Sequence, residues 1–179
     1  MPHDTPASAW VQRWAHLLAP QGAVLDVACG QGRHMRFFSE RNHAVTGVDI
    51  APSAIETAAQ WGCVVQADLE NAAWPLPGQQ FAGVIVTNYL WRPLLPAILA
   101  SLAPGGVLLY ETFAQGHEQW GRPSRADFLL RPGELLQACA ALHIAAYEHG
   151  YEAQPPRLVQ RIAAIHPLTG KPCMPALAG

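Results

Sequence analysis

The stretch VLDVACGQGRH, residues Val24–His34, decides the fold class of this chain. It opens with a short apolar run, which is typical of a strand buried on both faces of a parallel sheet. Asp26 stands inside that run, and small residues follow at alternate positions, Ala28, Gly30 and Gly32. Small residues let the backbone approach a ligand closely, and a helix that starts next points its N–H groups at negative charge. The stretch predicts a strand–turn–helix unit that holds a small charged cofactor. A tight turn without a ligand is the alternative interpretation.

Strand and helix patterns alternate along the rest of the chain. Strands are predicted at 23–28, 44–50, 63–69, 81–90 and 107–113, and helices at 31–41, 52–61, 92–106 and 131–142. Two last strands, 143–152 and 157–166, follow without a helix between them and are expected to pair antiparallel. This order predicts a doubly wound α/β fold, a mostly parallel seven-stranded sheet that ends in an antiparallel strand pair.

Three helices have a core-facing side that the sequence defines. A helix over Ser8–Leu18 is expected to use Trp10 and Trp14 for packing. The helix over 92–106 presents one apolar stripe, made of Leu94, Leu95, Ile98, Leu99 and Leu102. The helix over 131–142 is expected to turn four side chains inward, Leu135, Leu136, Cys139 and Leu142.

Length and composition limit the possible classes of protein. The 179 residues suffice for one sizeable core, so 1–179 is predicted to be a single domain, with a helical extension at 1–20 and a loose tail at 167–179. Half of the residues are apolar and 13% are charged, which favours a compact globular chain. A formal charge of −2 without a Lys/Arg run disfavours nucleic acid as a partner. The absence of a signal-like start or a long apolar stretch predicts a cytoplasmic protein with no membrane partner.

The cysteines and histidines do not indicate a metal site. Cys29, Cys63, Cys139 and Cys173 form no CxxC pair, and the eight histidines are scattered. Structural zinc sites normally show such close spacings, so no metal is expected. Free thiols in a chain without a signal favour a reducing compartment. Cys29 is expected to be a small buried residue of the turn with no reactive role.

Acidic residues follow successive predicted strands. Asp49 ends the second strand, where a carboxylate can accept both ribose hydroxyls, and Asp68 follows the third strand, within reach of an adenine amino group. A dinucleotide fingerprint would need a third glycine, but Met35 occupies that position. Together with Asp26, these residues predict a nucleoside site at the carboxyl ends of the strands.

The combination resembles the class I S-adenosylmethionine-dependent methyltransferases. The matching segments are DVACGQG (Asp26–Gly32), Asp49 with Ile50, ADL (Ala67–Leu69), VIVTNYL before residue 91, and LAPGGVLLYE before residue 112. Ala28 replaces the family's first glycine and narrows the room beside the methionine part of the cofactor. A narrower likeness, to small tellurite-resistance and thiopurine-type bacterial methyltransferases, rests on residues 29–55.

The resemblance implies S-adenosylmethionine as cofactor, S-adenosylhomocysteine as product, and a small-molecule or metalloid methyl acceptor. The cofactor-binding residues that it implies, together with those read from the glycine turn, are Asp26, Ala28, Cys29, Gly30, Gly32, Arg33, Asp49, Ile50, Ala67, Asp68, Leu69 and Asn88. Arg33 and His34 open the helix after the turn, where they are expected to help neutralise the cofactor's carboxylate.

The acceptor is expected to enter over the ends of the fourth and fifth strands. Candidates there are Asn88, Tyr89, Trp91 and Arg92, then Glu111, Phe113, His117 and Trp120. Catalytic roles are assigned to Asn88, Tyr89 and His117. Asn88 is a hydrogen-bonding partner of the acceptor or a strand-end turn residue, and His117 is a general base or a solvated loop histidine. Arg92 and Arg122 steer an anionic substrate or face solvent.

Other functions remain as alternatives at this stage. An RNA or protein methyltransferase is disfavoured by the acidic balance, and a nicotinamide-dependent oxidoreductase by the missing third glycine. A non-catalytic nucleoside-binding module stays open, because methyl transfer needs no covalent nucleophile that the sequence would reveal.

Overall fold

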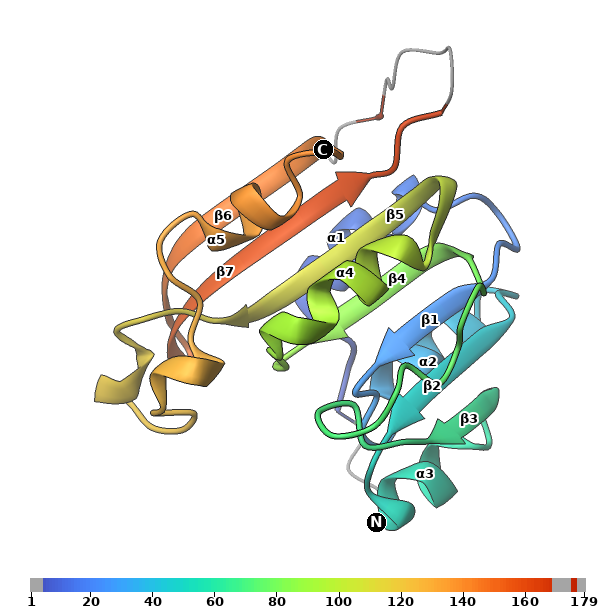
Figure 1. The fold of residues 1–179 in the computed structure, drawn as a ribbon, viewed down its shortest axis with the longest axis horizontal. Helices are drawn as coiled ribbons and strands as arrows, with labels where there is room; N and C mark the ends of the chain where they lie inside the picture. The colour runs from blue at the N-terminus through green and yellow to red at the C-terminus, as the bar shows by residue number, and fades with distance from the viewer. Residues whose placement is uncertain (1–4, 169–174, 177–179) are drawn as a thin grey trace.

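A single mixed sheet organises the protein, whose computed structural model describes residues 5–168 and 175–176. Seven strands lie in the order β3-β2-β1-β4-β5-β7-β6 (Figure 1). Their bounds are β1 Val24–Val27, β2 Val45–Asp49, β3 Cys63–Gln66, β4 Phe81–Thr87, β5 Leu102–Phe113, β6 His143–Ala153 and β7 Pro156–Ile165. Neighbours from β3 to β5 pair parallel, whereas β7 pairs antiparallel with both β5 and β6. The predicted fold class is confirmed.

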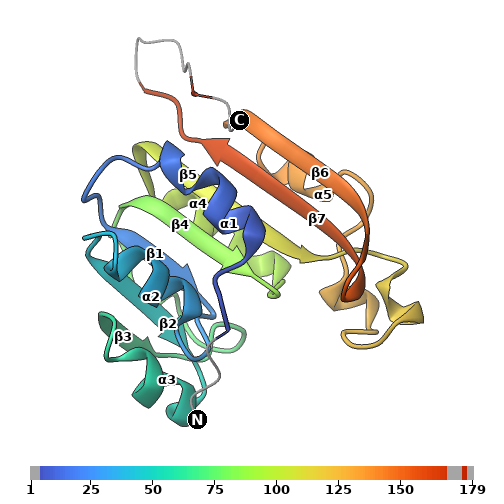
Figure 2. The same ribbon diagram turned by 180° about the vertical axis from the view of Figure 1, so that it is seen from behind.

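Helices cover both faces of this sheet, as the two opposite views show (Figures 1 and 2). The α-helices are α1 Ala9–Trp14, α2 Arg33–Ser39, α3 Pro52–Ala58, α4 Leu95–Ala100 and α5 Glu134–Ala138. One apolar cluster packs α4 and α5 against the sheet, and a second cluster on the opposite face packs α1 and α2. Two layers of helix around a parallel sheet leave the carboxyl ends of the strands as the open edge, where ligands bind in such folds.

The N-terminal helix is fastened across the sheet. Ser8 caps α1 by accepting a hydrogen bond from the N–H of Trp10, and η1 (Ala15–Leu17) continues the helix. Trp10 and Trp14 are both buried, and the indole N–H of Trp10 donates to the carbonyl of Ile162 at 3.2 Å. The prediction of a packing helix in this region is confirmed.

Two predicted helices are shorter in the structure. The segment from residue 92 forms η2 (Arg92–Leu94) and α4, and Leu102 already belongs to β5, where it pairs with Phe81. The apolar stripe therefore continues into a strand, and Leu102 is buried in the same cluster as α4.

The helix predicted over 131–142 shrinks to α5, and the inward assignment of Leu136 is wrong. Leu136 is 38% exposed, whereas its neighbour Leu135 is buried. Consecutive helical residues point about 100° apart, so a single-turn helix cannot bury both against one sheet.

The tail prediction falls partly outside the described residues. Residues 169–174, which include Cys173, and residues 177–179 lie outside them. Within the described part of the chain, no helix is both long and apolar enough to cross a membrane.

Gly47 in β2 tests how tightly the sheet packs beneath the glycine-rich turn. A Cβ at Gly47 would lie 2.4 Å from the Sδ of Met35 and 2.8 Å from the Sγ of Cys29, so Gly47→Ala must displace both. We expect a loss of about 1–3 kcal/mol in the free energy of unfolding, measured by urea denaturation. Gly150→Ala in β6 is the matched control, because a Cβ there meets nothing within 4 Å. Equal stability of the two variants would contradict this packing.

Candidate functional site

The turn between β1 and α2, residues 28–32, is here named the glycine collar. Its small residues all have left-handed backbone: φ is 55° at Ala28, 53° at Gly30 and 81° at Gly32. Residues with a Cβ disfavour this conformation, which explains the glycines at 30 and 32, whereas Ala28 adopts it at a cost. A Cβ at Gly30 would meet nothing within 4 Å, so the collar borders open space. At Gly32 a Cβ would come within 2.9 Å of the Cβ of Ala58, because α3 packs closely there.

Asp49 fastens the collar to the end of β2. Its Oδ2 accepts a hydrogen bond from the N–H of Gly30 at 2.8 Å, and its Oδ1 accepts from the N–H of Ala51 at 2.9 Å. Each carboxylate oxygen keeps further lone-pair capacity for a ligand. The next residue, Ile50, is 57% exposed, which leaves an apolar side chain uncovered beside the carboxylate.

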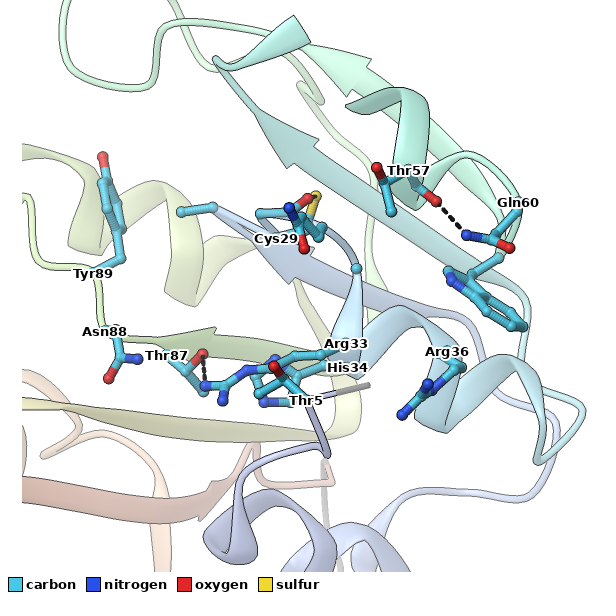
Figure 3. A pocket seen from close by; sticks show the side chains of 15 residues that line it. Thr5, Cys29, Arg33, His34, Arg36, Thr57, Gln60, Thr87, Asn88 and Tyr89 are labelled. Atoms are coloured by element: carbon cyan, nitrogen blue, oxygen red, sulfur yellow. Dashed lines mark hydrogen bonds between the residues drawn. The ribbon is translucent and has the colours of Figure 1, made fainter. Parts of the chain in front are cut away.

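A cavity of about 720 Å³ opens beside the collar (Figure 3). That volume lies in the range of small-molecule sites. Predicted site residues that line it are Ala28, Cys29, Gly30, Gly32, Arg33, His34, Asn88 and Tyr89. Lining residues that sequence reasoning did not single out are Thr5, Gln31, Arg36, Thr57, Gln60, Trp61 and Thr87.

The remaining predicted cofactor residues do not line the cavity. They are Asp26, Asp49, Ile50, Ala67, Asp68 and Leu69. Leu69 is buried in the core. Asp68 accepts hydrogen bonds from the N–H groups of Glu70 and Asn71 and from the Asn71 side chain, and these bonds lower the pKa of its carboxyl. Asp68 therefore stabilises a turn after β3, a role that an acidic residue after a strand also fits.

A buried pair lies below the collar. Burial raises the pKa of Asp26 to about 8, although Arg33 opposes the rise. Its Oδ2 has no hydrogen-bond partner and lies 3.9 Å from the Nδ1 of His34. Burial and Arg33 lower the pKa of His34 to about 3, and its Nε2 accepts from the N–H of Ser8 at 3.2 Å. His34 is therefore neutral, and the expectation that it neutralises a cofactor carboxylate is wrong.

Arg33 and Cys29 differ in the direction of their side chains and in the reactivity of their functional groups. The Arg33 side chain extends from the start of α2 toward Thr87, away from Cys29, and its Nη2 donates to the Thr87 hydroxyl at 3.4 Å (Figure 3). Burial, together with Asp26 and Asp49, raises the pKa of the Cys29 thiol to about 12. Cys29 is a buried, inert residue of the collar, in agreement with the prediction.

The β5 strand fixes the turn after β4. Asn88 has a left-handed φ of 55°, and its N–H donates to the carbonyl of Glu111 at 2.9 Å. The hydroxyl of buried Tyr110 donates to the carbonyl of Tyr89 at 2.8 Å. The Asn88 side chain is exposed on the cavity wall, while the Tyr89 hydroxyl is buried without a partner and burial raises its pKa. The turn is thus held by its backbone, and the exposed side chain of Asn88 stays available.

The candidates beyond β5 have structural partners. His117 in η3 (His117–Gln119) is buried, stacks on Phe113 with ring centroids 4.3 Å apart, and pairs its Nε2 with the carbonyl of Arg122 at 3.1 Å. It does not line the cavity, and the alternative of a solvated loop histidine is wrong. Trp120 packs on Tyr151 at the surface.

Two charged candidates, Arg92 and Glu111, also have ion-pair partners within the fold. Arg92 donates to both carboxylate oxygens of Glu134, at 2.6 and 2.9 Å, and to the carbonyls of Asp127 and Leu129. Its expected role in steering an anionic substrate is wrong, because this guanidinium closes the loop before α5. Glu111 is buried, pairs with Arg161 at 3.0 Å and accepts from the Ser8 hydroxyl at 2.9 Å.

The sheet order defines a doubly wound α/β fold, and the collar after β1 and Asp49 at the end of β2 lie at its open edge. Comparison with known proteins gives its relatives. Residues 24–106 match the family model described as a methyltransferase domain. The resemblance to class I S-adenosylmethionine-dependent methyltransferases, stated from the sequence, is confirmed.

Individual relatives agree with that family. Malonyl-[acyl-carrier protein] O-methyltransferase of Serratia marcescens is 35% identical over 112 residues, 56% of this chain and 42% of the relative. Trans-aconitate 2-methyltransferase of Delftia acidovorans is 33% identical over 101 residues, 51% of this chain and 38% of the relative. The chain thus spans about two fifths of the length of these curated relatives. The crystal structure of TehB from Haemophilus influenzae superposes with a TM-score of 0.71 at 18% identity, over 92% of this chain and 64% of that one.

The electrostatics below the collar predict a pH-dependent stability. Since folding raises the pKa of Asp26 from 3.8 to about 8, the folded protein keeps a proton that the unfolded chain loses. The free energy of unfolding therefore falls as pH rises from about 4 to 8. Asp26→Asn removes this loss, so its stability relative to wild type should increase by on the order of 1–3 kcal/mol between pH 5 and pH 8.5 in urea denaturation. Asp127→Asn, at an exposed residue paired with Arg125, serves as control. A variant whose advantage does not grow with pH would refute the buried, protonated state.

Proposed function

We propose that this protein is an S-adenosylmethionine-dependent methyltransferase acting on a small-molecule acceptor. The observation that carries the proposal is the glycine collar, held open beside a cavity and tied by Gly30 to Asp49. The same observation fits the cofactor's shape, because a nucleoside with a charged tail needs both close backbone approach and a carboxylate for its ribose. Both curated relatives carry methyltransferase names, which supports the same reaction class.

The residues present fit the cofactor. The unpartnered, buried Oδ2 of Asp26 is an acceptor below the collar, suited to the cofactor's ammonium group, and Ile50 offers an uncovered apolar side chain for adenine. We assign the ribose to the remaining lone pairs of Asp49, and contacts to Ala28, Cys29, Gly30 and Gly32. Ala67, Asp68 and Leu69 would act by shaping the segment after β3. When bound, the cofactor supplies a methyl group activated by its sulfonium.

The chain's own task is to align the acceptor and exclude water, because methyl transfer is an in-line displacement. Asn88 and Tyr89 stand on the cavity wall, and β5 holds their backbone in place. We propose that Asn88 hydrogen-bonds the acceptor and that Tyr89 closes the wall. His117, buried away from the cavity, would act only by supporting the loop after β5.

The alternatives can be ordered on structural grounds. Met35 is buried where a dinucleotide-binding chain would carry its third glycine, which disfavours a nicotinamide-dependent oxidoreductase. A cavity of small-molecule size favours a small or metalloid acceptor over RNA or protein. A non-catalytic nucleoside-binding module would bind the cofactor without turnover. We further propose one domain over the whole chain and, from the free thiols of Cys29 and Cys139, a cytoplasmic location.

Ligand-induced stabilisation tests the proposed cofactor. S-adenosylhomocysteine at about 100 times its Kd should raise the Tm by about 5–10 °C, because it binds only the folded state, whereas NADH should not. Asp49→Asn should abolish the shift, since the amide cannot serve Gly30 and a ribose as the carboxylate does; Asp127→Asn should keep it. Stabilisation by NADH alone would favour the oxidoreductase. Methyl transfer from radiolabelled S-adenosylmethionine to a cell extract separates the enzyme from the non-catalytic module.

A further inference from the structure

His34 lies at the edge of the cavity, and the proposed function gives it no role (Figure 3). Its imidazole is buried and neutral, and the main-chain N–H of Ser8 donates to its Nε2 at 3.2 Å. A neutral imidazole that accepts a hydrogen bond at one ring nitrogen carries its proton on the other. The contact with Ser8 therefore fixes the tautomer of His34, and its Nδ1 is an N–H donor.

The nitrogen that carries this proton lies next to Asp26. The Nδ1 of His34 is 3.9 Å from the Oδ2 of Asp26, which is too long for a hydrogen bond, and that oxygen is buried without a partner. A buried polar atom without a partner costs free energy, so it indicates a contact that forms when a ligand is bound. The proposed function assigns the cofactor's ammonium group to this same oxygen.

Ser8 is held in place on the side away from His34. Its hydroxyl donates to Glu111 of β5 at 2.9 Å and accepts from the N–H of Trp10 at 3.2 Å. Glu111 is in turn paired with Arg161 of β7 at 3.0 Å. A series of contacts that begins in the sheet thus sets which nitrogen of His34 carries the proton.

Building on the proposed function, we infer that His34 is a positioning residue for the cofactor's ammonium group, because its Nδ1–H donates to the Oδ2 of ionised Asp26 and holds that carboxylate in place below the glycine collar. A carboxylate oxygen has lone pairs for both the imidazole N–H and an ammonium group. Each of these donors favours the ionised form of Asp26. His34 acts through Asp26 alone, so the adenosine part of the cofactor does not depend on it.

The surroundings of Asp26 make this contact dependent on pH. Arg33, beside His34 on α2, favours the ionised carboxyl, whereas Asp49 at the end of β2 opposes it, and the Cys29 thiol of the collar stays protonated. Burial outweighs Arg33 and raises the pKa of Asp26 to about 8. A ligand with an ammonium group should therefore bind more tightly as the pH rises from about 6 to 8. Loss of the His34 donor should move this rise to higher pH.

Two substitutions separate the ring nitrogens of His34. Asn places an amide at the position of Nδ1 and keeps a donor toward Asp26, whereas Gln reaches the position of Nε2 and loses that donor. Isothermal titration compares S-adenosylhomocysteine with 5′-methylthioadenosine, which lacks the amino-acid tail. We expect His34→Gln to weaken S-adenosylhomocysteine about tenfold and His34→Asn by less than about threefold. Both variants should bind 5′-methylthioadenosine within about threefold of wild type. His16→Asn, at an exposed histidine bonded to the Arg13 carbonyl, is the control and should change neither affinity.

A double-mutant cycle tests whether His34 acts through the carboxylate. Asp26→Asn should itself weaken S-adenosylhomocysteine, and His34→Gln added to it should have no further effect, because the two side chains then no longer share an interaction. The pH profile gives a second readout that a purely structural role would not move. The affinity of His34→Gln for S-adenosylhomocysteine should rise at higher pH than that of wild type.

The outcomes separate the inference from the proposed function. If wild type does not bind S-adenosylhomocysteine, the proposed function fails first. If it binds, the inference is overturned when His34→Gln keeps the full affinity, or when it weakens both ligands equally, because His34 then only supports the fold. It is also overturned if His34→Asn binds as weakly as His34→Gln, or if His34→Gln weakens S-adenosylhomocysteine further in the Asp26→Asn background.

Discussion

The hydrogen bond from the Gly30 N–H to Asp49 is the constraint on which the site depends. The collar contains three left-handed residues, Ala28, Gly30 and Gly32, and Ala28 alone costs about 1–2 kcal/mol in that conformation. Such a turn persists only where its surroundings over-determine it. Here β2 does so twice, through Asp49 and through the Val48 carbonyl, which accepts from the N–H of Cys29 at 3.0 Å. The adjacent parallel strands β1 and β2 end side by side, with Val27 opposite Val48, and this position makes the collar rigid.

Ser8 likewise holds its segment in place through two hydrogen bonds, on the other side of the cavity. Its N–H donates to His34 in α2 and its hydroxyl donates to Glu111 in β5, so a single residue ties the N-terminal segment to two elements. Thr5, three residues before Ser8, lines the cavity. The wall is assembled from the first residues of the described chain, the collar and the turn after β4, and Figure 2 shows α1 crossing the sheet on the face that α2 shares. Neutral His34 is necessary to this arrangement, since a protonated imidazole could not accept the Ser8 N–H.

The sequence predicts the parts of this site that local chemistry determines. Left-handed backbone favours glycine, so Gly30 and Gly32 were recognisable, and a carboxylate at a strand end made Asp49 recognisable. An acid after a strand is ambiguous, however, because Asp68 uses its carboxylate to cap a turn.

Long-range pairing is the part that sequence patterns do not reveal. Arg92 and Glu134 are 42 residues apart, and nothing in the pattern around Arg92 indicates that a carboxylate will occupy it. Thr5 and Trp61 reach the cavity only through the docking of α1 and α3. The failure at Leu136 has a different cause, since adjacent residues of a helix point in different directions, and in the short helix α5 Leu135 takes the buried position.

Asp26, buried below the collar, and Arg33, on the cavity wall, interact electrostatically. Arg33 lowers the pKa of Asp26, and Asp26 raises that of Arg33, although burial dominates both. A cationic group that approached the Oδ2 of Asp26 would favour the ionised carboxylate and release its proton. The ionised carboxylate would in turn offset part of the field of Arg33 at the end of β4. An anion held there would restore the balance, because it places a negative charge on the opposite side of the same guanidinium. A cation at Asp26 and an anion at Arg33 would therefore each favour the presence of the other.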